Sequence, residues 1–429
     1  MKIKFTSTDY NTLIEGARAN KKPHRKPIRP NIFFRTLMKV IAQPDLIATR
    51  FTHERVGMER LGKDESAFYL MNHSSFIDLE IAADLLYPRP FNIVATTDGF
   101  IGKDWLMHKI GCIPAKKFVS DPALVRDMLH ASRKLRDSIL MYPEVGYSLD
   151  GTATTLPDSL GKCVKLLGMP LVMIRTYGAF TRDPVYNNLQ RRKIKVSAKM
   201  EYLLSPDEIK EKSADEINAI ILEQFSFDNF AWQRENKVKI DEDFRADGLH
   251  RVCYKCPHCG KEGRMHGEGV SLTCGECGAK YILDEYGVLV REGGEAKFDS
   301  VPKWYRWERE CARAEVESGE YLSDFPVDIF AAVDTKKLYS IGSGRLIHDK
   351  DGFTLTSDDG QLNYHQKATA NYSINANFNW YEIGDIVSVG DAECLFYCLP
   401  RVEGVSVAKL RLAAEEAYKI GWAEKNMDK

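Results

Sequence analysis

The sequence lacks any run of about 18 consecutive apolar residues, the length that a membrane-spanning helix needs. It also lacks a charged and then apolar leader after Met1, the pattern of an export signal. We therefore expect a cytoplasmic protein that does not cross the bilayer. Internal repeats and low-complexity tracts are absent as well.

Net charge is nearly absent, because 60 Lys and Arg residues face 61 Asp and Glu residues. No basic field of the whole chain then attracts nucleic acid, and we expect no such partner. A chain of 429 residues is longer than a domain with a single hydrophobic core usually is, so we predict two or three domains. Four of the ten cysteines lie in two C-x-x-C pairs, which favours a metal in a reducing compartment over disulfides.

Residues 1–49 form a basic and amphipathic N-terminal segment. The stretch "RANKKPHRKPIR" (18–29) is basic, and "NIFFRTLMKVIAQ" (31–43) predicts a short helix with a broad apolar face that Pro44 ends. Such a pair fits a protein lying on an anionic surface, here the inner face of the membrane. Alternatively, the apolar face packs on the next domain and the charges are solvated.

Residues 50–240 alternate between apolar strand-like runs such as "FNIVAT" and "PLVMIRTYG" and helical stretches such as "DLEIAADLL". This alternation predicts an α/β domain, a sheet covered by helices. Glycine and cysteine become denser near residue 248, where we place a boundary. A small cysteine-rich segment (248–284), a helical connector (285–321) and a β-rich module with a C-terminal helix (322–429) complete the predicted organisation.

The stretch "YLMNHSSFIDLE" (70–81) places His73 and Asp78 five positions apart. On one helix they would point about 140° apart, but they can meet if His73 lies in a loop and Asp78 in the first helical turn. Ser75-x-x-Asp78 is also a capping-box pattern, in which Asp78 would only satisfy backbone N–H groups. One carboxylate can also do both jobs.

The N-H-x-x-x-x-D pattern in "NHSSFID" is followed by three further blocks: "IGCIPAKKF" (110–118), "YPEVGYSLDG" (142–151) and "GMPLVMIRTYG" (168–178). In this order they resemble the signature of the glycerolipid acyltransferase superfamily, in particular the 1-acylglycerol-3-phosphate acyltransferases. The resemblance covers roughly residues 50–200 and identifies 50–240 as an acyltransferase domain. It implies transfer of a fatty acyl group from acyl-CoA or acyl-carrier protein to the hydroxyl of a lysophospholipid or glycerol phosphate.

The residue types suit this chemistry, because a free alcohol is a poor nucleophile and needs a base beside it. His73 would be the general base and Asp78 would orient it and stabilise the imidazolium, with no covalent acyl-enzyme. Helix capping is the expected duty of Ser74 and Ser75.

The resemblance also implies a substrate-binding set, which comprises Lys116, Lys117, Glu144, Gly146 and Ser148. The two lysines stand where the family usually places a phosphate-binding arginine, so they can bind phosphate without the bidentate fork. Glu144 would line the acceptor site, and its alternative is an ordinary surface turn residue.

The third block departs from the family pattern. Val145 replaces a glycine, Gly146 a threonine and Tyr147 an arginine, so a second phosphate-binding cation is missing. Arg175 or Arg182 could compensate, or the head group of the acceptor is not a simple phosphate monoester. The alternative is a protein without catalytic activity, namely a lipid-binding or membrane-tethering protein on an acyltransferase fold.

"CPHCG" and "CGECG" place Cys256, Cys259, Cys274 and Cys277 in a C-x2-C-x14-C-x2-C pattern that closely resembles a zinc ribbon. Four thiolates leave no open coordination position, so the zinc would be structural and would supply much of the folding energy. Iron is the less favoured metal. Zinc ribbons also occur in nucleic-acid proteins, but the flanking segment 282–320 is rich in Asp and Glu.

Overall fold

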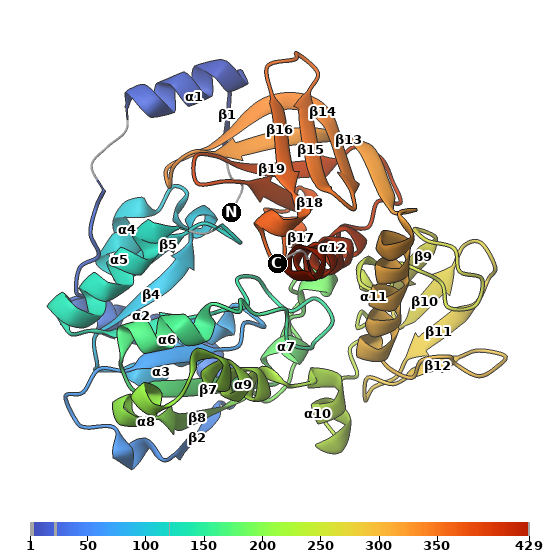
Figure 1. Ribbon diagram of the computed structural model, residues 1–429. Coiled ribbons are helices and arrows are strands. Elements are labelled where there is room, and N and C mark those ends of the chain that lie inside the picture. The colour runs from blue at the N-terminus through green and yellow to red at the C-terminus, as the bar shows by residue number, and fades with distance from the viewer. Residues whose placement is uncertain (1–3, 21–23, 120, 428–429) are drawn as a thin grey trace.

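The structure, a computed structural model, describes residues 4–20, 24–119 and 121–427. Lys21, Lys22 and Pro23 of the predicted basic segment therefore lie outside the described residues. Within the described ranges no helix is both long and apolar enough to cross a membrane. Figure 1 shows the N-terminal α/β part, the cysteine-rich sheet and a curved C-terminal sheet packed side by side.

The largest α/β part is built on a seven-stranded sheet in the order β2-β8-β7-β3-β6-β4-β5. Its pairings are parallel except that β8 runs antiparallel to β7. The strands are β2 (Thr52–Val56), β3 (Phe68–Met71), β4 (Phe91–Thr96), β5 (Cys112–Ala115), β6 (Ser138–Met141), β7 (Leu171–Tyr177) and β8 (Ser197–Leu204). Buried apolar runs suit such strands because helices cover both faces.

Two apolar clusters cover this sheet, one on each face. One contains Leu46 of α2 (Ile32–Ala48) and Ile81 of α3 (Ile77–Leu86). The other contains residues of α5 (Pro122–His130), α6 (Leu160–Leu167), α8 (Pro206–Glu211) and α9 (Ala214–Phe225). Shorter helices are α4 (Asp104–Lys109), α7 (Ala179–Arg182) and α10 (Asn229–Glu235). The predicted sheet covered by helices is confirmed.

The N-terminal helix is longer than predicted. Pro44 does not end α2, which continues to Ala48. A proline this close to the end of a helix removes few backbone hydrogen bonds, and the buried side chains of Ala42 and Leu46 hold both sides of it against the domain.

The cysteine-rich part is a four-stranded antiparallel sheet of β9 (Met265–Glu268), β10 (Ser271–Cys274), β11 (Lys280–Leu283) and β12 (Leu289–Arg291). The start of the predicted helical connector thus forms strand β12, and α11 (Val301–Ser318) is its helix. Trp304 of α11 packs edge-on against Tyr281 of β11, with ring centroids 4.9 Å apart.

The C-terminal module is β-rich and ends in a helix, as expected. Its strands are β13 (Leu322–Ala332), β14 (Leu338–Asp349), β15 (Gly352–Ser357), β16 (Asn363–Lys367), β17 (Asn375–Trp380), β18 (Gly384–Gly390) and β19 (Leu395–Pro400), followed by α12 (Val407–Met427). The sheet order is β16-β15-β14-β13-β19-β18-β17. Strand β1 (Phe5–Ser7) pairs with β14, and α1 (Tyr10–Ala19) buries Leu13 and Ile14 in the same core. The start of the chain is therefore part of the C-terminal sheet, which the sequence did not predict.

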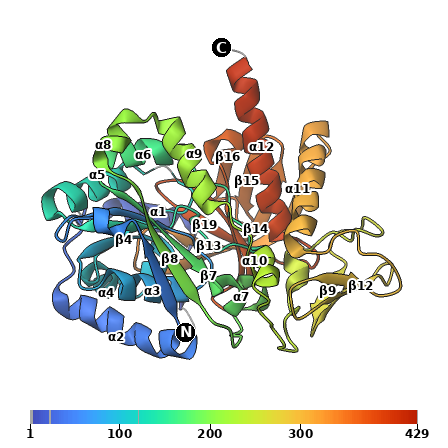
Figure 2. The same cartoon turned by 90° about the horizontal axis from the view of Figure 1, so that it is seen from below.

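One continuous apolar cluster joins the parts. It contains Tyr281 of the cysteine-rich sheet, Trp304 of α11 and Leu346 of β14. Leu149 and Tyr186 extend the cluster into the α/β domain. The C-terminal module is thereby held against the α/β domain, and α12 of this module lies beside α11 (Figure 2).

Candidate active site

His73 and Asp78 meet at the end of β3. His73 lies in the loop, Asp78 in the first turn of α3, and Nδ1 of His73 is 3.3 Å from Oδ2 of Asp78. The same carboxylate oxygen accepts hydrogen bonds from the backbone N–H groups of Ser74 (2.6 Å) and Ser75 (2.9 Å). Asp78 is fully buried. One carboxylate therefore satisfies two backbone N–H groups just before α3 and also contacts the imidazole.

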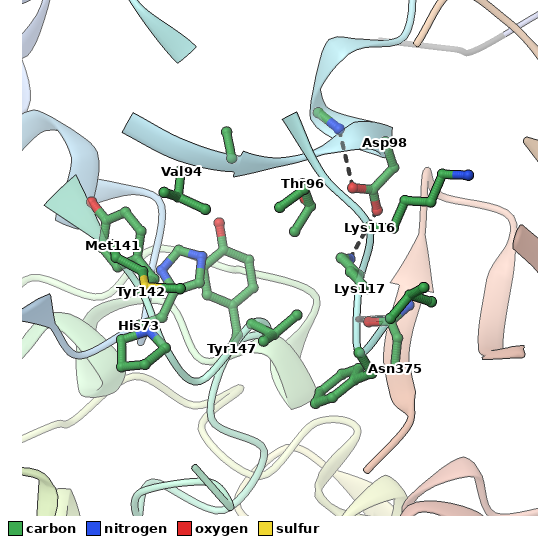
Figure 3. Close-up of a pocket in the computed structure, with 18 of the residues that line it drawn as sticks. His73, Val94, Thr96, Asp98, Lys116, Lys117, Met141, Tyr142, Tyr147 and Asn375 are labelled. Carbon is green, nitrogen blue, oxygen red and sulfur yellow. Dashed lines mark hydrogen bonds and ion pairs between the residues drawn. The ribbon is translucent and has the colours of Figure 1, made fainter. Parts of the chain in front are cut away.

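Two tyrosine rings enclose the imidazole of His73. The ring centroids of Tyr142 and Tyr147 lie 4.4 and 4.3 Å from that of His73, at tilts of 32° and 41°. With 22% of the side chain exposed, His73 faces a cavity (Figure 3). Because Nδ1 faces Asp78, Nε2 is the nitrogen left for another partner.

The loop after β6 is tied to the histidine through the backbone. Oε2 of Glu144 accepts a hydrogen bond from the backbone N–H of His73 (2.7 Å), and Oε1 accepts one from Thr154 (2.9 Å). The backbone N–H of Ser148 donates to the carbonyl of His73 (3.1 Å), and its hydroxyl donates to the carbonyl of Thr152 (2.6 Å). Both Glu144 and Ser148 are buried and neither is among the residues that line the cavity, so the structure places them behind His73.

Burial raises the pKa of Glu144 to about 7, although its two backbone donors act to lower it. Burial also raises the pKa of Tyr142 and of Tyr147 well above the ordinary value. Both phenols are therefore neutral near pH 7, whereas Glu144 changes its charge there.

The cavity encloses about 1880 Å³ at the carboxyl ends of the parallel strands β3, β4, β5 and β6. That edge is the usual position of a site in an open α/β sheet. His73, Lys116, Lys117 and Gly146 of the predicted set line it. The facing wall comes from the C-terminal module, including Asn375 (Figure 3). No pattern in the acyltransferase blocks could have pointed to that wall.

The two predicted phosphate-binding lysines have protein partners. Nζ of Lys117 is 2.8 Å from Oδ2 of Asp98, and Nζ of Lys116 donates to the carbonyl of Ala392. Although burial acts to raise the pKa of Asp98, Lys117 and nearby hydrogen-bond donors hold it below its ordinary value. Burial lowers the pKa of Lys116. The charge on Lys117 is thus balanced inside the protein.

Arg175 and Arg182, either of which could have compensated for the missing cation, do not line the cavity. Arg175 donates to Gln224, and Arg182 pairs with Asp45 and Asp183. Both guanidinium groups are instead used to join the strand and its following turn to neighbouring elements.

The backbone at Val145 is strained, which explains why the family pattern has glycine at this position. Its φ angle is +63°, in the left-handed region that a β-branched residue rarely adopts. The next residue, Gly146, forms a tight hydrogen bond to the carbonyl of Glu144 (2.7 Å). The loop therefore keeps the tight turn, although valine adopts its left-handed backbone conformation less readily than glycine does.

The four ribbon cysteines converge as predicted. Their sulfur atoms all lie within 4.8 Å of one another, with Cys256–Cys277 at 3.7 Å and Cys259–Cys274 at 3.8 Å. A tetrahedron with zinc–sulfur bonds of about 2.3 Å has edges of about 3.8 Å, so this set fits such a metal. Gly260 and Gly278, each after a pair, have φ angles of +77° and +72°, which permits the tight turns.

His73 thus faces the cavity at the carboxyl end of β3, and Asp78 is buried behind it. Residues 53–175 match the family described as Acyltransferase, which supports an acyltransferase domain in this part of the chain. Among solved structures, the 1-acyl-sn-glycerophosphate acyltransferase PlsC from Thermotoga maritima is similar at 16% identity and a TM-score of 0.37, over 44% of this chain and 76% of that one. No curated protein matches the chain.

Proposed function

We propose that the protein transfers a fatty acyl group from acyl-CoA or acyl-carrier protein to the hydroxyl of a lysophospholipid or glycerol phosphate. The observation that carries the proposal is the His73–Asp78 pair, with Nδ1 on the carboxylate and the ring facing a cavity of about 1880 Å³. The family match over residues 53–175 supports the acyl-transfer chemistry. The cavity is large enough for an acyl chain and an acceptor together.

His73 would act as the general base. Its Nε2 takes the proton of the acceptor hydroxyl as the oxygen attacks the thioester carbonyl, and Asp78 stabilises the imidazolium that forms. Collapse of the tetrahedral intermediate breaks the carbon–sulfur bond, and the imidazolium returns its proton to the leaving thiolate. The hydroxyl of Ser75 donates to Asp183, and that of Ser74 accepts from Asn72, so neither serine is needed as a nucleophile.

We also propose that the protein lies on the inner face of the membrane through α2 and α4. The exposed apolar side chains of these helices are Ile32, Phe33, Leu37, Val40, Ile41, Ile47, Trp105 and Leu106. Phe34 and Trp105 join the helices with ring centroids 6.1 Å apart. Helix α3 packs beside α2 (Figure 2). Exposed Phe76, just before α3, and Leu79 of α3 line the cavity, so a lipid acceptor could enter from the same surface.

For the cysteine cluster we propose a structural zinc ion held by Cys256, Cys259, Cys274 and Cys277. The sulfur spacing and the all-thiolate set support zinc. Bound there, the metal would stabilise the ribbon and would take no part in acyl transfer, because no position is left for substrate.

The second candidate function is a lipid-binding or membrane-tethering protein without catalysis. It is favoured by the pairing of Lys117 with Asp98 and by Tyr147 at the place of the family's arginine. A cavity that keeps its lipid but lacks a working acceptor site would still bind.

Transfer of radiolabelled acyl groups from acyl-CoA and from acyl-carrier protein to a panel of lysolipids tests both candidates. We expect product with the wild-type protein and a loss of at least about 100-fold with His73→Ala and with Asp78→Asn. Tyr87→Phe, at a residue that is not among those lining the cavity, serves as a control. A protein that binds lipid but acylates no acceptor would support the tethering function instead.

A further inference from the structure

The C-terminal module supplies the cavity wall that faces the proposed base. Tyr372, Asn375 and Asn377 belong to this wall, together with Tyr418 and Trp422 of α12. A Cβ atom added to Gly146 would lie 4.0 Å from Oδ1 of Asn375, so β17 closely approaches the loop beside His73. Figure 3 shows Asn375 beside Lys117, across the cavity from His73.

Strand β17 presents neutral hydrogen-bonding groups to the cavity. Asn375 and Asn377 are two positions apart and share one face, and Ala376 and Phe378, which belong to the core of the module, also border the cavity. Nδ2 of Asn375 donates to the hydroxyl of Ser388 (2.9 Å), which leaves its carbonyl oxygen as an acceptor. The half-buried amide of Asn377 has no hydrogen-bond partner among the described residues.

The two lysines that follow β5 are poorly suited to a phosphate monoester, whereas the exposed Lys103 and Lys162 also line the cavity. Such a group carries close to two negative charges and is held best by unpaired cations, above all by bidentate arginine. Here Lys117 is balanced by Asp98, and Lys116 is bonded to a backbone carbonyl. Tyr147 stands in place of the arginine. A phosphodiester carries a single charge and needs less compensation.

The size of the cavity agrees with a larger head group. Its volume of about 1880 Å³ exceeds the roughly 300–1,000 Å³ of ordinary ligand pockets, so space remains beyond an acyl chain and a bare phosphate. Amide groups donate and accept, and hydroxyl groups do the same. The asparagine wall is therefore matched to hydroxyls.

We propose that β17 of the C-terminal module forms the head-group subsite, and that it takes a lysophospholipid whose phosphate is a diester to a hydroxyl-bearing group such as glycerol. This inference rests on the proposed acyltransferase function. The phosphodiester lies by Lys116 and Lys117, and the head-group hydroxyls bond to Oδ1 of Asn375 and the amide of Asn377. The C-terminal module thus selects the acceptor.

The test compares three acceptors with the same acyl chain, using the full-length chain and one acyl-CoA. They are lysophosphatidate with a monoester, lysophosphatidylglycerol with hydroxyls and lysophosphatidylcholine with a diester but no head-group hydroxyl. We expect the glycerol compound to have the highest kcat/KM, and Asn377→Ala to lower that value about tenfold through KM, while the value for lysophosphatidate changes less than about twofold. The KM for acyl-CoA stays unchanged. Asn363→Ala, on exposed strand β16, is the matched control.

Preference for lysophosphatidate, or an equal loss for all three acceptors in Asn377→Ala, would overturn the subsite while the acyltransferase function stands. Equal use of the glycerol and choline compounds would overturn the need for hydroxyls. If no acceptor is acylated, the proposed function fails, and equilibrium binding of the same three lysolipids to wild type and Asn377→Ala still decides the subsite. Asn377 is half-buried, so its variant is expected to fold, unlike a variant of the buried Asn375.

Discussion

Glu144 connects two loops of the site through its two carboxylate oxygens. One oxygen holds the backbone N–H of His73 and the other that of Thr154, at 2.7 and 2.9 Å. Only an ionised carboxyl accepts at both oxygens without directing its own O–H at a donor. The role that the structure supports for Glu144 is to position the histidine backbone, and it acts from behind the cavity wall.

This arrangement predicts a steep loss of activity in mild acid. With its pKa raised to about 7 by burial, Glu144 takes up a proton as the pH falls below that value, and one of its two bonds is lost. Because that bond holds the loop of His73, log(kcat/KM) should fall more steeply below about pH 7 when Glu144 is present than when it is replaced. Glu144→Gln should lower activity about tenfold at pH 8 and make the fall in mild acid less steep.

The pH profile of kcat/KM for the wild type, Glu144→Gln and the exposed control Glu223→Gln measures this effect. An identical slope in the first two proteins would show that Glu144 does not titrate with activity.

The left-handed backbone at Val145 is a second property of one residue. A β-branched side chain at φ +63° costs about 1–2 kcal/mol, which glycine avoids. Part of that gain is lost because glycine is more flexible in the unfolded chain. We expect Val145→Gly to stabilise the protein by about 1 kcal/mol.

Chemical unfolding of Val145→Gly measures this change, and Val125→Gly, in the middle of α5, is the control that should destabilise by about 1 kcal/mol. Destabilisation by Val145→Gly would mean that the lost side-chain contacts outweigh the strain.

At the scale of elements, the long buried segments were predictable and the short ones were not. The runs "FNIVAT" and "DLEIAADLL" became β4 and α3 because burial on both sides of a sheet leaves an unmistakable apolar pattern. Strand β1 has three residues and β2 is the polar sequence "THERV", so neither carries a pattern of its own. Their place depends on the partners β14 and β8, which only the folded chain shows.

The same difference applies to the site. His73, Asp78 and the four cysteines could be found because each set is local in sequence or has a fixed spacing. Asn375 could not, since it lies 302 positions after His73 (375 − 73) and reaches the cavity only through the packing of another module. Its one local signal is the alternation of asparagine in "NANFNW", which indicates a strand with a polar face.

Helix α2 makes a testable prediction at this scale. Phe33 and Ile41 are each 63% exposed on one element of the proposed membrane surface. Burying two such side chains in a lipid interface contributes about 1–3 kcal/mol each, so Phe33→Ser with Ile41→Ser should weaken vesicle binding at least about 30-fold.

Co-sedimentation with anionic phosphatidylglycerol vesicles measures the binding. Leu222→Ser is the matched control, because Leu222 is 55% exposed on α9, across the sheet from α2 (Figure 2). Unchanged binding of the α2 variant would mean that this face packs on another protein.

At the scale of the whole molecule, Glu415 of α12 connects the parts around the cavity. It accepts hydrogen bonds from Thr155 of the α/β domain (3.0 Å) and Ser373 of the C-terminal module (2.7 Å), and pairs with Arg309 of α11 at 2.7 Å. Although burial acts to raise it, Arg309 and Arg411 lower the pKa of Glu415 to about 2. Hydrogen bonds and an ion pair of Glu415 thus fix α12 to the neighbouring parts. The position of the cavity wall that α12 contributes therefore depends on α11.

The cysteine cluster therefore has an effect beyond its own sheet. Tyr281 of the ribbon packs on Trp304 of α11, and α11 is bound to α12, whose Trp422 lines the cavity. If zinc supplies much of the folding energy of the ribbon, its loss should loosen this series of contacts.

We expect one zinc ion per chain. We expect Cys274→Ser or a strong chelator to remove the metal, lower the Tm of the whole chain and reduce acyl transfer in parallel. Elemental analysis, thermal unfolding and the transfer assay on the same samples measure the three quantities, with Cys311→Ser on α11 as the thiol control. If the metal-free protein kept its Tm and its activity, the ribbon would be an independent attachment and α11 would be held by the C-terminal module alone.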